Sequence, residues 1–127
     1  MVHNNRLKSL LNCPQIVYGN FTCSNNCLES FEHSPVIVHG NFVATGNPGI
    51  TSIDGLPKQI YGDIYLDSHI EDFPCSIIEG SVYINKDRKD YFNSINYIMR
   101  SNKEMFTPYL GNREKVKELL KLFYHQV

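Results

Sequence analysis

Cysteine and histidine are the residues in this chain that could act as nucleophiles or metal ligands. There are four cysteines and five histidines among 127 residues. Cys23 and Cys27 are separated by three residues and are followed by His33 and His39, so a zinc site can be imagined. Zinc ligands usually come as closely spaced pairs, however, and Cys23 alternates with apolar residues that we expect in a core. We therefore expect no metal ion and no cofactor.

A cysteine nucleophile has equally little support. Cys13 and Cys75 both adjoin a proline and are better explained as turn residues, and no histidine is marked out as their base. The chain also contains no glycine-rich phosphate loop, no Gly-x-Ser-x-Gly elbow and no His-x-x-x-His pair. We therefore expect that this protein binds a partner and is not an enzyme.

Length and hydropathy limit the class of protein further. A chain of 127 residues can form one domain with one core. No stretch approaches the roughly 18 consecutive apolar residues of a membrane helix, and the N-terminal residues lack the apolar run of a signal peptide. We expect a cytoplasmic protein with reduced cysteines and no membrane partner.

Charge divides the chain into two segments. Residues 1–85 contain three basic and eight acidic residues, a net charge of −5, whereas residues 86–127 contain nine basic and five acidic residues, a net charge of +4. Such a difference can reflect two segments with different roles or solvated surface alone. We place the boundary near residue 85.

Four glycines mark an internal repeat with separations of 21, 22 and 18 residues. They are Gly19, Gly40, Gly62 and Gly80. Apolar residues stand two positions before each glycine and two and four positions after it, which is the period of a β-strand with one buried face. One strand is therefore predicted in each repeat, over residues 16–23, 37–44, 59–66 and 77–84. Because glycine is costly within a strand, we expect backbone, a large side chain such as Phe21 or Phe42, or a bulge at this position.

A second apolar pair, three residues apart, precedes each glycine. The pairs are Leu7/Leu10, Leu28/Phe31, Ile50/Ile53 and Ile70/Phe73. The first complete unit, Phe21-x-Cys23-x-x-Asn26-x-Leu28-x-x-Phe31, resembles the leucine-rich repeat pattern Leu-x-Leu-x-x-Asn-x-Leu-x-x-Leu. Short units of this kind look like the leucine-rich-like repeat proteins that are common among bacteriophage hypothetical proteins.

The resemblance covers about residues 6–85 and implies a solenoid with a parallel sheet. In the family, the repeat asparagine hydrogen-bonds the backbone of the turn. The second repeat has Asn47 at this position, whereas the third has Ser68 or His69, so the third turn is expected to be less regular.

After residue 85 the apolar period changes from two to about 3.6, which predicts helices. One helix is expected over residues 87–101, with Asp87 or Asn85 as its N-cap, and a second after Gly111 and Asn112. The expected fold class is α+β: a short leucine-rich-repeat-like β-solenoid of about four units over residues 1–85, capped by C-terminal helices over residues 86–127 of the same domain. The helices could instead serve as a basic docking element.

Strand alternation also predicts which residues line the outer face of the repeats. Tyrosine is an ordinary strand residue, but exposed tyrosines beside carboxamides and carboxylates also make a good protein-recognition surface. The candidate partner-binding residues are Tyr18, His39, Tyr61, Asp63, Tyr65, Asp67 and Tyr83.

The expected function is the binding of a protein. The phage resemblance implies a phage-encoded inhibitor or modulator of a host enzyme or defence complex, located in the host cytoplasm. The alternative is a nucleic-acid-binding accessory protein that acts through the basic C-terminal helices, although the acidic repeats disfavour a polyanion. An open N-terminal edge at residues 7–13 also invites pairing with a second copy.

Overall fold

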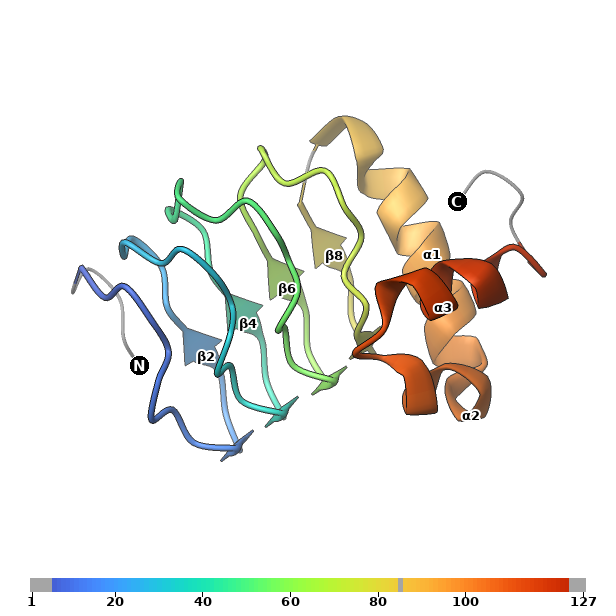
Figure 1. Cartoon of the computed structure of the whole chain (residues 1–127), viewed down its shortest axis with the longest axis horizontal. Helices are drawn as coiled ribbons and strands as arrows, with labels where there is room; N and C mark the ends of the chain where they lie inside the picture. Colours follow the sequence, from blue (N-terminus) through green and yellow to red (C-terminus); the bar gives the residue numbers. More distant parts are fainter. Residues whose placement is uncertain (1–5, 85, 124–127) are drawn as a thin grey trace.

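The repeats form a solenoid of short parallel strands, and helices pack on its C-terminal end (Figure 1). The computed structural model describes residues 6–84 and 86–123. Each repeat forms one coil, and each coil contributes two strands. In coils 1 to 4 these are β1 (Ile16–Val17) and β2 (Phe21–Thr22), β3 (Ile37–Val38) and β4 (Phe42–Val43), β5 (Gln59–Ile60) and β6 (Ile64–Tyr65), and β7 (Ile77–Ile78) and β8 (Val82–Tyr83).

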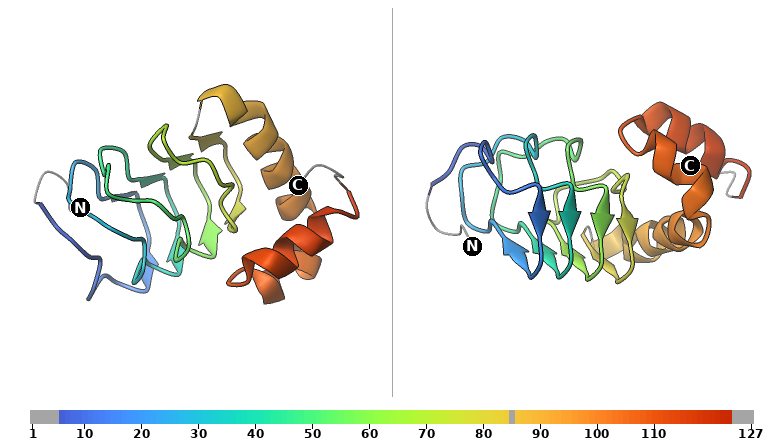
Figure 2. Two further views of the ribbon diagram at one scale, coloured as in Figure 1. Left: turned by 45° about the horizontal axis from the view of Figure 1, so that its top comes forward. Right: turned by 90° about the horizontal axis from the view of Figure 1, so that it is seen from below.

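Two parallel sheets run along the solenoid where one was expected. Sheet A has the order β1-β3-β5-β7 and sheet B the order β2-β4-β6-β8. Figure 2 shows the two strands of each coil meeting at an angle. The prediction of one continuous strand per repeat is therefore wrong, because the chain bends at the glycine. The register is the predicted one: Val17 pairs with Val38, and Phe21 pairs with Phe42.

The glycines are needed because consecutive coils approach one another closely at this bend. The N–H of Gly40 donates to the carbonyl of Gly19, and that of Gly62 to the carbonyl of Gly40, both at 3.0 Å. A Cβ added to Gly40 or Gly62 would overlap backbone and side-chain atoms of the preceding coil. Of the explanations left open by the sequence, the backbone of the neighbouring coil is the one observed.

Side-chain oxygens next to the glycines form a second set of bonds between coils. Oδ1 of Asn20 accepts from the N–H of Asn41, Oδ1 of Asn41 from the N–H of Asp63, and Oδ1 of Asp63 from the N–H of Ser81, each at 2.8 Å. We call these four residues the corner ladder. The ladder satisfies backbone donors at a bend where the strands do not pair.

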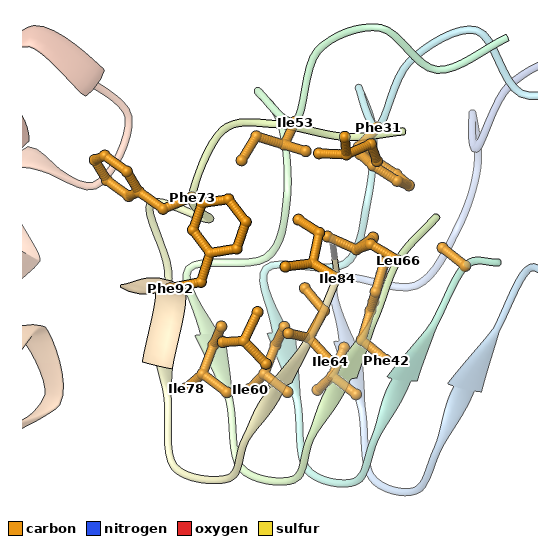
Figure 3. Packing of buried hydrophobic residues seen from close by; sticks show 14 of the residues in the cluster. Phe31, Phe42, Ile53, Ile60, Ile64, Leu66, Phe73, Ile78, Ile84 and Phe92 are labelled. Carbon is orange, nitrogen blue, oxygen red and sulfur yellow. The ribbon is translucent and has the colours of Figure 1, made fainter. Parts of the chain in front are cut away.

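The core lies inside the coils and continues under the helices. Phe21 and Phe42 stack with 5.5 Å between ring centroids, and Phe31 meets Phe42 edge-on at 5.9 Å. Cys23 is fully buried, as its place in the apolar row requires. The buried side chains of the coils and Phe92 of the helical segment belong to one cluster (Figure 3). Each coil therefore depends on its neighbours for burial.

The repeat asparagines hydrogen-bond the turns that follow sheet B. Nδ2 of Asn47 donates to the carbonyl of Ala44 at 3.1 Å, and its Oδ1 accepts from the N–H of Leu28 at 3.3 Å. In the third repeat, Nε2 of His69 lies 2.6 Å from the carbonyl oxygen of Ile50. A different side chain thus contacts the turn of the preceding coil there.

Residues 86–123 form three helices and two 3-10 turns. They are a 3-10 turn (Lys86–Arg88), α1 (Lys89–Ser101), α2 (Lys103–Phe106), a 3-10 turn (Thr107–Tyr109) and α3 (Arg113–Leu120). Asp87 lies within the first 3-10 turn and is not the N-cap of α1, which is Arg88. The alternative cap, Asn85, lies outside the described residues. Asn112 does cap α3, because its Oδ1 accepts from the N–H of Lys115 at 3.1 Å.

Helix α1 packs against β7 and β8 and covers the last coil (Figure 1). Its buried side chains, which include Phe92, Ile95 and Met99, join the core of the solenoid. The expected α+β solenoid of parallel strands with C-terminal helices is thus confirmed at the level of architecture. Within residues 6–84 and 86–123, every helix is too short or too polar to span a membrane.

Candidate functional site

Three aromatic side chains form a stack on the outer side of sheet A. The rings of Tyr18 and His39 are 5.1 Å apart at an interplanar angle of 8°, and those of His39 and Tyr61 are 4.9 Å apart at 10°. Tyr18 is 80% exposed and Tyr61 48% exposed. We call this stack the aromatic ladder. It arises because each ring follows a strand of sheet A at the same register position in consecutive coils.

A row of mostly aliphatic residues lies beside the aromatic ladder. Alternation places Ile16, Ile37 and Gln59 on the same outer face of sheet A, two residues before each ring. Ile16 is exposed, and the other two are half-buried. These three residues and the three residues of the aromatic ladder include no acid, lysine or arginine.

Sequence reasoning missed this aliphatic row although a signal was present. Isoleucine stands three positions before the glycine in three of the four repeats, at Ile16, Ile37 and Ile77. That position points outward if Val17 points inward. In coil 4, Ile77 is buried, so the exposed part of the row ends at coil 3.

The aromatic ladder ends at coil 4, where Glu79 takes the equivalent position. Its Oε2 lies 2.7 Å from Nζ of Lys103 in α2 and accepts from Nε2 of Gln59 at 3.4 Å. The hydrogen bond from Lys103 is the main cause of a lowered pKa for this carboxyl group. Glu79 therefore links the solenoid to the helices.

Two further predicted tyrosines form a separate stack on sheet B. The rings of Tyr65 and Tyr83 are 4.7 Å apart at 10°, and Nζ of Lys89 lies 4.9 Å from the Tyr83 centroid. Oη of Tyr65 lies 3.5 Å from Oδ2 of Asp63. Desolvation, followed by the Asp63 charge, raises the pKa of Tyr65. The predicted tyrosines are thus divided between two sheets that meet at the corner ladder.

The two predicted carboxylates, those of Asp63 and Asp67, accept hydrogen bonds from backbone N–H groups. Asp63 belongs to the corner ladder and accepts from the N–H of Ser81. Asp67 accepts from the N–H of Gly46 at 2.6 Å through Oδ1 and from that of Asn47 at 2.8 Å through Oδ2. Both side chains join consecutive coils, so their main contacts are structural.

The thiols of Cys13, Cys23 and Cys75 lie in surroundings that disfavour the reactive thiolate. Burial raises the pKa of Cys23 to about 12 and that of Cys75 to about 11, and it raises the pKa of Cys13 as well. In the part of the chain that the structure describes, no group of three or more histidine, cysteine or acidic side chains could hold a metal ion. The raised pKa values make the thiols of Cys13, Cys23 and Cys75 poor nucleophiles.

Several basic side chains of the helices contact the solenoid. Nη1 of Arg100 donates to the carbonyl of Gly80 at 3.0 Å, and Nη1 of Arg113 donates to that of Phe73 at 2.9 Å. Nε of Arg113 also lies 3.5 Å from Oδ1 of Asp54. Together with the ion pair of Lys103, these contacts place part of the basic charge of residues 86–123 against the acidic repeats.

Comparison of the chain with protein-family models, with curated proteins and with solved structures gave no match.

Proposed function

We propose that this protein is a protein-binding repeat module whose partner docks on the outer face of sheet A. The observation that carries the proposal is the aromatic ladder of Tyr18, His39 and Tyr61, which is exposed and already stacked. Ile16 and Ile37 extend the face with aliphatic surface. We do not include Asp63 and Asp67, because their carboxylates are engaged by backbone N–H groups.

The geometry of the ladder favours association with another protein. Side chains that are free in solution lose entropy when a partner immobilises them, and rings held against one another lose less. Tyrosine provides a large apolar area and a hydroxyl group, and it is enriched among the residues that dominate interface energies. The aromatic ladder and the aliphatic row beside it contain no acid, lysine or arginine, so a partner that covers them avoids the cost of desolvating such ions.

From the resemblance to phage proteins we further propose that the protein is a phage-encoded inhibitor or modulator. It would act on a host enzyme or defence complex in the host cytoplasm. The raised pKa values of Cys23 and Cys75 disfavour covalent catalysis by these two thiols, in keeping with a binding role. The alternative, a nucleic-acid-binding accessory protein, would use the basic helices. It is less well supported because Arg100, Lys103 and Arg113 contact the repeats.

The test combines partner capture with matched tyrosine variants. Tagged protein is used to isolate partners from host extract with and without nuclease, and the affinity for the purified partner is then measured. Tyr18→Ala with Tyr61→Ala should weaken binding by roughly 2–4 kcal/mol, since interface energy concentrates in a few aromatic side chains. Tyr97→Ala is the control, because Tyr97 is 61% exposed and belongs to α1 and not to the aromatic ladder.

Three outcomes would contradict the proposal. One is wild-type affinity in the double tyrosine variant. Another is an equal loss of affinity in Tyr97→Ala. The third is binding that disappears after nuclease treatment and is abolished when Lys115, Lys117 and Lys121 are changed to glutamate, which would establish the nucleic-acid alternative.

A further inference from the structure

The N-terminal end of the solenoid presents two strand edges. Among the described residues, β1 pairs only with β3, and β2 pairs only with β4. The N–H groups of Phe21 and Cys23 donate to coil 2 at 2.8 Å, so alternation turns the N–H of Thr22 away from coil 2 and toward this end. Backbone groups of this kind are a template for another strand.

An apolar pocket of about 450 Å³ opens at the same end. Its lining residues are Leu7, Ser9, Leu11, Asn12, Cys13, Pro14, Ile16, Val17 and Phe21. Leu11 is 61% exposed although it is a large apolar residue. The strand edges and the pocket together make a surface that combines outward-facing backbone groups with accessible apolar side chains.

The C-terminal end shows how this chain closes a coil. The side chain of Asn93 in α1 accepts from the N–H of Val82 at 2.9 Å and donates to the carbonyl of Val82 at 3.0 Å. Asn96 and Arg100 both donate to the carbonyl of Gly80 at 3.0 Å. These side chains take the place of a following coil at the bend and along β8. Within residues 6–24, no comparable group faces the outer edge of coil 1.

The exposed strand edges also lack the charged residues that usually protect them. Residues 14–24 contain no acidic or basic side chain, and the charged residues of the segment 6–24 are Arg6 and Lys8, which precede the strands. Natural proteins commonly place lysine on an open edge to prevent pairing with another chain. An uncharged edge is therefore suited to pairing.

We infer that this end is a self-association surface and that a second copy of the chain covers it end to end. An occupant must match two short edges joined at a glycine bend and must fill an apolar pocket between them. A single extended peptide follows one edge only, whereas a second copy presents the same two edges joined at a bend. A two-fold axis through the bend would lay β1 antiparallel to β2 of the other copy and bring the two pockets together. The same surface on both subunits gives a closed dimer. This inference is independent of the proposed partner face.

The test measures the oligomeric state of the full chain by sedimentation equilibrium. The protein concentration is varied from about 1 µM to about 1 mM, the range in which small interfaces dissociate. Leu11→Lys should raise the dimer dissociation constant by at least about tenfold, because it places a charge in the apolar end surface. Leu122→Lys is the matched control: Leu122 is 71% exposed, and Lys121 and Leu122 follow α3 at the other end of the chain. Circular dichroism checks that both variants fold.

The wild-type protein offers a second measurement. End-to-end association brings Arg6 and Lys8 of both copies to the same interface, so screening of like charges should strengthen the dimer when salt is raised. A monomer at every concentration would overturn the inference. So would a dimer weakened by salt, or a dimer that Leu122→Lys or Tyr61→Ala weakens as much as Leu11→Lys does.

Discussion

Replacing Gly62 by alanine should destabilise the solenoid, whereas the same change at Gly19 should not. Both glycines occupy the bend of a coil, but their surroundings differ. A Cβ on Gly62 would lie 2.7 Å from the carbonyl carbon and oxygen of Gly40 and would overlap Oδ1 of Asn41. A Cβ on Gly19 would meet no atom within 4 Å. The pair therefore isolates the effect of stacking on a preceding coil.

The size of the effect follows from the distances. Ordinary contacts of a Cβ begin near 3.4 Å, so coil 3 would have to move away from coil 2 by about 0.7 Å. The bond from the Gly62 N–H to the Gly40 carbonyl, now 3.0 Å, would then exceed hydrogen-bonding distance. Overpacking typically costs 1–3 kcal/mol and a lost hydrogen bond about 1 kcal/mol, so we expect a loss of about 2–4 kcal/mol. Gly19→Ala should stay within about 1 kcal/mol of wild type, with stabilisation as the expected sign.

Urea unfolding followed by circular dichroism measures both variants. The midpoint should fall for Gly62→Ala with the slope unchanged, which indicates a loss of native stability rather than a change in the denatured state. Equal stability of the two alanine variants would refute the explanation of the glycine repeat by close approach of the coils.

Two further predictions concern the contacts between helices and coils. Asn93→Ala should lower stability by about 1–3 kcal/mol in thermal unfolding, because it leaves the N–H and carbonyl of Val82 without their side-chain partner; an unchanged midpoint would contradict this. The lowered pKa of Glu79 means that its ionised form stabilises the fold: this contribution is complete above the ordinary value of 4.5 and is lost as pH falls through the lower folded-state pKa. Glu79→Gln should therefore flatten the acid limb of stability measured against pH, and Lys103→Ala should do the same.

The sequence predicted the register of the solenoid but not its bend. Alternation continues through the glycine, since Val17, Phe21 and Cys23 all reach the core. The same pattern therefore describes one straight strand or two strands meeting at an angle. The bend depends on contacts with the neighbouring coil, which a single repeat does not contain.

Only part of the candidate site could be predicted, because the sequence again does not contain the contacts between neighbouring coils. Side chains that point outward were recognised from alternation, and the stacking of Tyr18 and His39 follows from the repeat spacing. The roles of Asp63 and Asp67 could not be read in this way, because a carboxylate facing solvent and one accepting from the next or preceding coil occupy similar positions in sequence. The repeat spacing aligns side chains, but only the fold brings particular N–H groups to them.

The corner ladder also makes the length of this protein adjustable. Each rung uses one side-chain oxygen and one N–H from the next coil, so an inserted unit with asparagine after its glycine would fit between existing units without changing them. A duplicated unit of 22 residues, the spacing from Gly40 to Gly62, would lengthen the outer face of sheet A by one strand spacing, about 4.8 Å. Because α1 closes only the final coil, such growth would leave the helical end intact. The number of repeats thus sets the length of the solenoid and of its outer face.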